Sequence, residues 1–510
     1  MRKRFFLSFG LLIAFGSVIV MFNSCDTNDD FLDVIPENDM DLYVYVVTAG
    51  TLPSVIAENE KYKIGALTLK GNLNGTDIRY IREMAGRNYE RGKTDGKLAN
   101  LNLAEVNIVS GGVSYTTYTY GAGYVGLSTE NNIIGRAMFY GCGSLKNIVL
   151  PNSVREIQTE AFAECTDLMS VTFGKNNNIY NNVGVFGGCG NIETLNLGDC
   201  SGYIYSSNLI AQKEFIVSEQ NQSYSAIDGV LFNKDKTQIL RFPTNKSDAT
   251  YIIPASVTLI GRSAFFGCSN LTNITIPDNV TAIVDYAFSY CTNASFTIKN
   301  SIASVGKSAF SGCTKLTSIT ITEAIWESAF YDCTGLTNVT IGNSVTSIGQ
   351  SAFGNCTGLS NVIIGNSVTG IGQSAFGNCL ELTEIHCKGT TPPFVVSNCF
   401  YNVDKTTCKL YVPKGYYTAY WIAPEWSEFD NIIEEENVTT INPINKDNIT
   451  FQSISNGIAI ETKEQMPVTV YNLSGQKVYQ NVVSGNVEIC LNKGVYILKI
   501  NDESEKVIVK

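Results

Sequence analysis

The stretch Leu336–Cys356 reads LTNVTIGNSVTSIGQSAFGNC, and Leu359–Cys379 repeats it as LSNVIIGNSVTGIGQSAFGNC. The two copies share GNSV, IGQSAFGNC and the same apolar positions. Further copies of the phrase A-F-x-x-C-x-x-L recur along the chain. A period of this size is typical of a solenoid, in which one small structural unit is copied and stacked. Solenoids build long surfaces and usually bind rather than catalyse.

The cysteine of each copy marks the period. Most cysteines of the repeats follow one another at steps of 22 to 24 residues, with one shortened step of 20. The short step predicts one coil with fewer residues than its neighbours. The first series is Cys142, Cys165 and Cys189, and the second is Cys268, Cys291, Cys313, Cys333, Cys356 and Cys379.

Each copy has two halves with different apolar spacing. The front half has apolar residues at positions 1, 4 and 6, which predicts a short strand. The back half, from Ile348 to Cys356, spaces its apolar residues by three to five, which predicts one tight helical or 3₁₀ turn. Gly342 and Gly365 mark the end of the strand in the two closest copies.

Stacking explains why each position keeps one residue type. In a coil of parallel strands about 4.8 Å apart, a side chain packs on its own copy in the neighbouring coils. Columns of Leu, Ile, Phe and Ala therefore predict a continuous core that no single copy could bury. An irregular copy supports this register: Ala294 replaces Leu after Cys291, and Phe296 and Ile298 come one residue early, as the 22-residue step to Cys313 requires.

The frame L-x-x-V-x-I-P-x-S-V-x-x-I-G-x-x-A-F-x-x-C resembles the BspA-like class of bacterial leucine-rich repeats. The chain carries it at Leu145–Cys165, Leu271–Cys291 and Leu336–Cys379. The resemblance implies a mixed α/β, strand-rich fold: a leucine-rich-repeat solenoid of parallel short strands and short helical turns. Ser344 and Ser367 stand where better-known leucine-rich repeats have Asn, so we expect no complete asparagine ladder.

The resemblance covers residues 131–435 and includes two special segments. An insert near residues 201–250 contains Ser225–Asn233 and Leu240–Pro243, which look like part of the same family. Residues 386–435 resemble the family's terminal cap, with Leu410–Gly415 and Trp426–Ile433. The whole of 131–435 is therefore predicted to be one repeat domain.

Both flanks of the repeats read as separate units. Residues 40–130 contain Leu73–Ile78 and Leu101–Leu103, which resemble atypical leading repeats, and a polar-faced cap is needed there to cover the first coil. Residues 447–510 contain Val468–Val478 and Asn492–Ile500, which predict strands joined by turns. This tail resembles the C-terminal sorting domain of the type IX secretion system, a small β-sandwich.

The N-terminus predicts export. Arg2–Arg4 precede an apolar run from Phe5 to Met21, which is typical of a signal peptide over residues 1–24 rather than of a spanning helix. Ser24-Cys25 resembles a bacterial lipobox, which implies lipidation of Cys25 and an anchor in the outer membrane, with residues 25–39 as a polar tether. An ordinary cleaved signal, which would give a secreted protein, and an uncleaved anchor remain alternatives. A lipid anchor and a sorting tail would be two different targeting signals on one protein.

The charge of the chain argues against nucleic acid as a partner. The formal net charge is −11, and removing residues 1–24 takes away three basic and no acidic residues, which gives −14. A basic stripe for nucleic acid is therefore not expected.

The cysteines predict packing rather than metal binding. Nine of the fifteen occupy one repeat position, which favours a buried column of free thiols over disulfides. His386-Cys387, Cys399 and Cys408 raise the question of zinc, but their spacing matches no standard finger. Structural packing or a Cys399–Cys408 bridge explains them better, so we expect no metal and no cofactor.

Catalysis finds little support in the residues. His386 is the single histidine, so triads and multi-histidine metal sites are excluded or incomplete. Gly306-Lys307-Ser308 resembles the end of a phosphate loop, but Ser301 stands where the leading glycine belongs. We therefore expect no catalytic site and a protein that is not an enzyme.

The outward positions of the strands are the candidate binding residues. Short hydroxyl and amide side chains there make a neutral, hydrogen-bonding face, although such residues also simply suit a solvated strand. The family resemblance implies adhesion to an extracellular protein or glycan, and a carbohydrate-binding or -processing accessory lipoprotein is the alternative. The candidates are Thr272, Asn273, Thr275, Thr337, Asn338, Thr340, Ser360 and Asn361.

Overall fold

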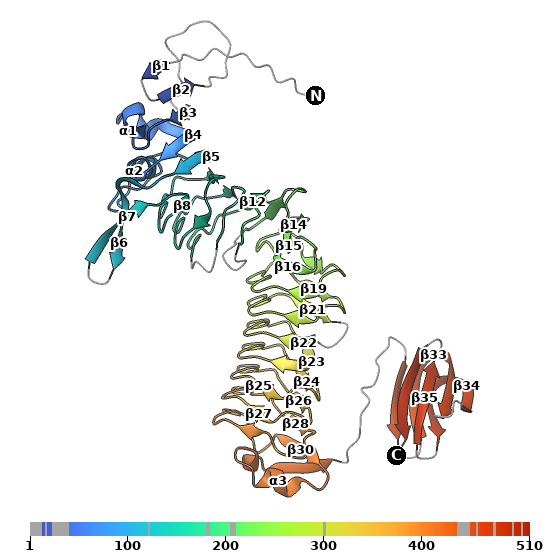
Figure 1. Ribbon diagram of the computed structural model, residues 1–510. Helices are drawn as coiled ribbons and strands as arrows, with labels where there is room; N and C mark the ends of the chain where they lie inside the picture. The colour runs from blue at the N-terminus through green and yellow to red at the C-terminus, as the bar shows by residue number, and fades with distance from the viewer. Residues whose placement is uncertain are drawn as a thin grey trace. The chain divides into compact units, whose positions relative to one another are not determined.

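The computed structural model divides the chain into two compact units, Met1–Ile433 and Glu434–Lys510 (Figure 1). Each unit is described by itself. The structure describes residues 13–15, 18–22, 40–120, 123–179, 184–204, 211–298, 302–435, 449–454, 457–472, 476–491, 494–500 and 503–509.

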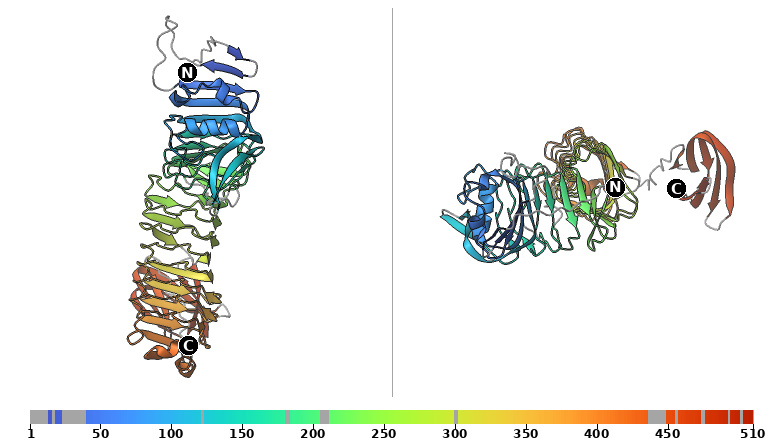
Figure 2. Two further views of the ribbon diagram at one scale, coloured as in Figure 1. Left: turned by 90° about the vertical axis from the view of Figure 1, so that its left-hand side faces the viewer. Right: turned by 90° about the horizontal axis from the view of Figure 1, so that it is seen from above.

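In many coils of the first unit the repeat contains two short strands. In the coil that begins at Leu336 these are β24 (Asn338–Ile341) and β25 (Ser347–Ile348). The next coil places β26 (Asn361–Ile364) and β27 (Gly370–Ile371) parallel to them and in the same register. The predicted stacking of like residues on like residues is confirmed, and Figure 2 shows the strands of successive coils lying one above the next.

The back half of each coil is a series of turns. Cys356 N donates to Phe353 O, as in a 3₁₀ turn, but Ser351 and Asn355 have φ values of 50° and 61°. These left-handed residues end each turn before it becomes a helix. The predicted single helical turn is therefore a run of separate turns. Phe353 N also donates to Ala375 O of the next coil at 2.8 Å.

The phenylalanine of each A-F pair forms a ladder through the core. The rings of Phe353 and Phe376 lie 5.3 Å apart and are tilted by 6°. Stacked pairs of 4.9 to 5.6 Å run from Phe242 to Phe400. Such ring pairs add specific contacts to the apolar area that they bury. The core therefore depends on coils that match one another.

The cysteine column satisfies buried carbonyl groups. Cys356 Sγ donates to Phe330 O of the preceding coil at 3.1 Å, and Cys379 Sγ donates to Phe353 O at 3.2 Å. The same bond recurs at Cys165, Cys189, Cys291, Cys313 and Cys333. A thiol is small and apolar but still carries a weak donor. The thiol therefore donates a hydrogen bond to a buried carbonyl group, as the side-chain amide of an asparagine ladder does in other solenoid proteins.

The shortened step between Cys313 and Cys333 joins two strands into one. β23 (Ser318–Ile325) pairs with β24 at its start and with β25 at its end. Three residues fewer lie between Ile321 and Ile325 than between Ile341 and Ile348, so the turn that separates the strands elsewhere is missing. The early residues Phe296 and Ile298 lie in β21 (Ser295–Ile298), opposite Ile274 and Ile276, and the predicted slip in register is confirmed.

Two large sheets, three smaller ones and two cores make up the described part of the first unit. In the nine-stranded sheet, neighbouring strands are parallel from β3 through β4, β5, β9, β11 and β12 to β13. β2 pairs with β3 in the antiparallel direction. β1 and β2 come from residues 1–24, which the sequence predicts to be removed. In order the strands are β1 (Ile13–Phe15), β2 (Val18–Phe22), β3 (Met40–Val46), β4 (Ile64–Leu73), β5 (Asn100–Ile108), β9 (Asn147–Val149), β11 (Ser170–Thr172), β12 (Thr194–Gly198) and β13 (Glu214–Val217).

The second sheet has fifteen strands, and a three-stranded sheet accompanies it. The strands of this fifteen-stranded sheet are β14 (Tyr224–Ile227), β15 (Val230–Asn233), β16 (Gln238–Arg241), β18 (Leu259–Ile260), β20 (Ala282–Ile283), β22 (Ile302–Val305), β23, β24, β25, β26, β27, β28 (Glu384–Cys387), β29 (Phe394–Val395), β30 (Lys409–Pro413) and β31 (Asn431–Glu435). The three-stranded sheet is β17 (Thr250–Ile252), β19 (Asn273–Ile276) and β21, and two pairs stand apart, β8 (Ile133–Ile134) with β10 (Glu156–Ile157) and β6 (Gly111–Tyr120) with β7 (Gly123–Thr129).

The insert near residues 201–250 separates the two cores. β14, β15 and β16 are antiparallel, unlike the coils on either side. Leu231 packs in the first core, whereas Val230 and Phe232 pack in the second. Because successive side chains of a strand point to opposite faces, β15 serves both cores. The prediction of one continuous core is wrong at this point.

Residues 40–130 pack around helix α2 (Gly75–Met84), which Figure 1 shows beside β6. Two shorter elements precede it, α1 (Leu52–Val55) and the 3₁₀ helix η1 (Lys61–Lys63). Asn74 caps the N-terminus of α2, and Asp77 completes a capping box. Asp77 is buried and also accepts hydrogen bonds from the backbone N–H groups of Gly50 and Leu52, so it ties the preceding loop to the helix.

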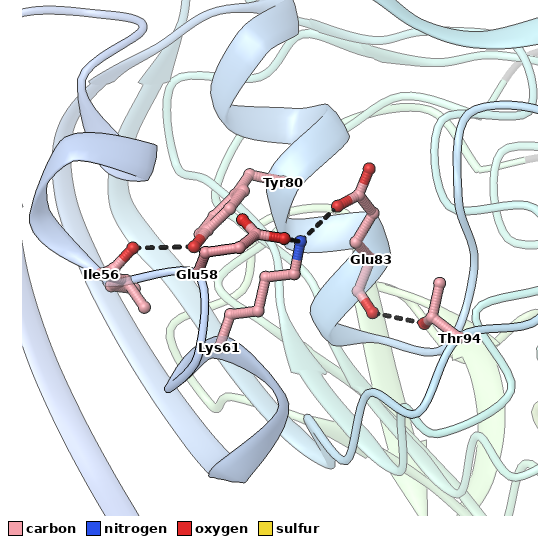
Figure 3. Close-up of polar contacts among 6 residues, drawn as sticks. All are labelled: Ile56, Glu58, Lys61, Tyr80, Glu83 and Thr94. Atoms are coloured by element: carbon pink, nitrogen blue, oxygen red, sulfur yellow. Dashed lines mark hydrogen bonds and ion pairs between the residues drawn. The ribbon is translucent and has the colours of Figure 1, made fainter.

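A buried lysine holds the same region together (Figure 3). Lys61 is 2% exposed, and its Nζ donates to Glu58 and, at 2.7 Å, to Glu83 Oε2. The Tyr80 hydroxyl donates to Ile56 O at 2.7 Å, and Thr94 Oγ1 donates to Glu83 O. Burial disfavours the charge of Lys61, but the two carboxylates outweigh it and raise the pKa of the ammonium. Lys61 is therefore a permanently charged structural residue.

The last coils end in an aromatic cap. The Trp426 ring meets Phe400 edge to face at 5.3 Å, and Trp426 Nε1 donates to Pro393 O at 2.9 Å. The Tyr420 hydroxyl donates to Gly389 O at 2.8 Å. The cap contains α3 (Tyr417–Trp421) and the 3₁₀ helix η3 (Trp426–Glu428). Trp426 thus closes the phenylalanine ladder.

The second unit is an antiparallel sheet of five strands. The register of its two longest strands breaks between Thr462 and Met466, and apolar residues from both halves, such as Ile458 and Val470, share one core. The predicted strands are present, and they belong to one sheet rather than to the two packed sheets of a β-sandwich. The strands are β32 (Ile449–Ile454), β33 (Gly457–Asn472), β34 (Lys477–Cys490), β35 (Gly494–Ile500) and β36 (Glu503–Val509). Among the described residues of either unit, no helix has the length and apolar character needed to cross a membrane.

The glycine after the second strand predicts a test of the stacking. A Cβ at Gly349 would lie 2.5 Å from the backbone carbon of Trp326 in the preceding coil, whereas a Cβ at Gly370 would meet nothing within 4 Å. We expect Gly349→Ala to lower the free energy of unfolding by about 1–3 kcal/mol, because the coils must move apart. Gly370→Ala should change it by less than about 1 kcal/mol. Urea unfolding of both variants checks this, and equal stabilities would contradict the close approach.

Candidate binding face

The outward side chains of the first strand in each coil form two rows, which we call the strand face. Paired residues of neighbouring strands lie side by side in each row. One row contains Ser318, Asn338, Asn361, Glu384 and Lys409, and the other contains Thr320, Thr340, Ile363, His386 and Tyr411.

The structure divides the eight predicted binding residues between two sheets. Thr337, Asn338, Thr340, Ser360 and Asn361 belong to or directly precede β24 and β26, and they are exposed or half-buried. The remaining three, Thr272, Asn273 and Thr275, lie on or beside β19 in the three-stranded sheet.

Three of the predicted residues have a structural use for their hydroxyl groups. Thr337 Oγ1 donates to Thr317 O of the preceding coil at 3.0 Å, and Ser360 Oγ donates to Thr337 O at 3.2 Å. Thr272 Oγ1 makes the same bond to Ala249 O at 2.9 Å. These hydroxyls join coils together. The outward side chains of Thr275, Thr340 and Asn361 are the better candidates for contact with a ligand.

The strand face changes character at its C-terminal end, which the sequence analysis missed. The His386 ring stacks on Tyr411 at 4.3 Å, and Glu384 Oε2 lies 3.8 Å from His386 Nε2. Glu384 Oε1 lies 3.9 Å from Lys409 Nζ. A neutral centre is therefore followed by a charged, aromatic end. The signal was present, because a strand that begins near Leu382 puts Glu384 and His386 outward.

The structure separates the residues of the hypothetical zinc cluster. His386 faces outward and Cys387 faces the core, because they are neighbours in one strand. Cys399 and Cys408 are free and buried, and burial raises the pKa of each thiol to about 12. No group of three or more His, Cys, Asp or Glu able to hold a metal occurs within the described part of the chain.

Two places are candidate small-molecule sites: the segment that resembles a phosphate loop and one gap in the core between coils. Ser308 has a φ of 51° in an ordinary repeat turn, and Lys307 Nζ lies 3.0 Å from Glu327. The gap between Val362, Phe376 and Phe400 is too small for a water molecule.

The comparisons with known proteins agree with this geometry. Residues 132–249, 244–327 and 323–443 match the BspA type leucine rich repeat region, in six copies. The chain belongs to the BspA-type leucine-rich repeat family. Residues 436–510 match the secretion system C-terminal sorting domain. The predicted family and tail are confirmed, and together they indicate an exported cell-surface protein. No catalytic family matches the BspA-type repeats or the tail, and no curated protein matches the chain.

Three solved structures are similar to this chain at low identity. The pneumococcal vaccine antigen PcpA is 18% identical, with 84% of this chain and 99% of that chain covered and a TM-score of 0.47. A leucine-rich repeat protein from Eubacterium ventriosum is 17% identical, with 76% and 93% covered and a TM-score of 0.44. One from Bacteroides ovatus is 20% identical, with 63% and 90% covered and a TM-score of 0.31. The family assignment rests on the repeats.

The buried thiols of the BspA-type coils predict a loss of stability in alkali. Burial raises the pKa of Cys268 to about 12, from an ordinary value of 9.0, as it does for Cys399 and Cys408. Between about pH 9 and 12 the unfolded chain releases thiol protons that the folded chain keeps, so the free energy of unfolding falls as pH rises. Urea unfolding at pH 7, 9 and 10.5 should show no loss of this kind up to pH 9 and a loss above it. Cys268→Ala should weaken the dependence, and an unchanged profile would contradict the assignment.

Proposed function

We propose that this protein is a non-catalytic adhesin whose strand face binds an extracellular protein or glycan. The observation that supports the proposal is the ordered row of outward Asn, Thr and Ser side chains on successive coils. Repeating hydrogen-bonding groups at the spacing of the coils suit an extended, repeating ligand better than a single small molecule. The family and the sorting tail, which indicate an exported cell-surface protein, support an extracellular ligand.

Charged substitutions in the middle of the strand face test the proposal. We expect Thr340→Glu with Asn361→Lys to weaken binding at least tenfold on an array of glycans and matrix proteins, because the contact would lose about 1.4 kcal/mol or more. Gln350→Glu with Gln373→Glu is the matched control, since both glutamines are exposed on the turn side of the same two coils. Equal binding by the face variant and the native chain would rule out this face.

An activity assay on the same purified chain distinguishes the adhesin from the alternative class, a carbohydrate-processing or -binding accessory lipoprotein. Release of reducing sugar from a bound glycan would support the alternative, whereas saturable binding without turnover supports the adhesin.

We further propose that a lipid attached to Cys25 anchors the protein in the outer membrane. Cys25 lies outside the described residues. The Ser24-Cys25 pair and the acidic run that follows support this anchor. Palmitate labelling in a native-like bacterial host should mark the wild-type chain and not Cys25→Ala, and mass spectrometry of the mature N-terminus should find a modified Cys25. An unmodified Cys25 in the mature chain would leave the sorting tail as the address.

A further inference from the structure

Three arginines gather beside the β6–β7 hairpin, away from the strand face. Arg87 and Arg91 come from the loop after α2, and Arg136 comes from the first turn after β8. Figure 1 shows the hairpin projecting next to α2. We call Arg87, Arg91 and Arg136 the arginine cluster.

Tyrosine rings hold the guanidinium groups in place. Arg136 Cζ lies 3.7 Å from the centre of the Tyr118 ring, and Arg91 Cζ lies 5.4 Å from the same ring. Arg91 Cζ also lies 4.5 Å from the centre of the Tyr140 ring. Two cations that share one ring are attracted to it but repel each other.

The charge of the cluster is not balanced by nearby carboxylates. Among the described residues, one ion pair reaches it: Glu160 Oε2, at 4.0 Å from Arg136 Nε. Arg87 and Arg91 donate instead to backbone carbonyls, Arg87 to Arg91 O at 2.9 Å and Arg91 to Thr117 O at 2.9 Å. Three positive charges thus face one distant negative charge in a chain whose net charge is −11.

Each arginine also has a donor without a partner. Arg87 Nε, Arg91 Nη2 and Arg136 Nε are buried and have no hydrogen-bond partner among the described residues, and Glu160 is 4.0 Å from Arg136 Nε, beyond hydrogen-bond distance. Most buried donors in folded proteins are paired, and a charged donor left unpaired costs more than a neutral one. The cluster therefore has more donors than acceptors, at the same place where it has more positive than negative charge.

Fastening the hairpin explains part of this arrangement. The bond from Arg91 Nε to Thr117 O and the bond from Arg136 Nη2 to the Tyr118 hydroxyl both attach β6 to the coils. These bonds use donors other than the three unpaired ones, and a hairpin clamp does not need three uncompensated charges. The clamp therefore leaves the excess positive charge of the cluster unused.

We propose that the arginine cluster binds the sulfate or phosphate ester of an extracellular polysaccharide. Such a group carries negative charge and several terminal oxygens, which suit a cluster with excess positive charge. Guanidinium groups held flat by aromatic rings are suited to planar, paired hydrogen bonds with oxyanions. Arg136 has 40% of its side chain exposed, so the group can contact this arginine from solvent. The inference rests on the proposed function for the extracellular setting but uses a separate surface.

Immobilised dextran sulfate, dextran phosphate, plain dextran and polyglutamate test the proposal with the full chain. We expect binding to the sulfate or the phosphate polymer and none to plain dextran, and the two charged dextrans identify which ester is preferred. Arg91→Gln with Arg136→Gln should reduce the affinity at least tenfold, because two charge-assisted contacts are lost. Thr340→Glu should leave this binding unchanged, which separates it from the strand face.

Two further variants keep the test decisive. Glu160→Gln removes the competing carboxylate and should raise the affinity severalfold, even if the double arginine variant melts at a lower temperature. Arg262→Gln is the matched control, because Arg262 lies 5.6 Å from the Tyr286 ring but is paired with Asp285 at 3.5 Å, so it should change nothing. Equal affinities for the wild type, the double variant and Glu160→Gln would overturn the proposal. Arginine-dependent binding to polyglutamate at the same affinity would also overturn it, in favour of an acidic protein partner.

Discussion

Contact between identical positions of neighbouring coils is the constraint on which this fold depends. Phe353 packs on Phe376, Val339 lies opposite Val362, and the thiol of Cys379 reaches the carbonyl of Phe353. No coil could bury these groups without its neighbours. The ends of the series therefore need their own solutions, and Trp426 supplies one of them by covering the last phenylalanine ring.

The repeat period in the sequence correctly predicted the strand residues and the positions of the irregular coils. Apolar spacing identified the strand residues, and the cysteine steps located both the slip at Phe296 and the short coil before Cys333. Spacing reports burial, however, and not which hydrogen bond a buried group makes. The left-handed turn at Ser351 and the thiol-to-carbonyl bonds were therefore not foreseen. The antiparallel insert that divides the core was visible as a gap in the repeats, but its two-sided packing at Leu231 needed coordinates.

At the candidate site, too, the sequence predicted which side chains face outward but not which hydrogen bonds they make. Strand alternation correctly placed Thr340 and Asn361 outward, while the hydroxyl bonds that occupy Thr337 and Ser360 depend on the distance between coils. The arginine cluster could not be found by any local pattern, since its members come from segments about 45 residues apart and meet only around Tyr118. Repeats thus reveal their own surface in the sequence, but the junctions between repeats and their flanks do not.

The close identity of the coils at Leu336–Cys356 and Leu359–Cys379 has a genetic consequence. Unequal recombination between two such similar stretches of gene would insert or delete one whole coil while leaving the reading frame and both caps intact. Each event would lengthen or shorten the surface by about 4.8 Å, the distance between parallel strands. Reach is thus a property that a bacterial lineage could vary in discrete increments, without inventing a new residue at any buried position.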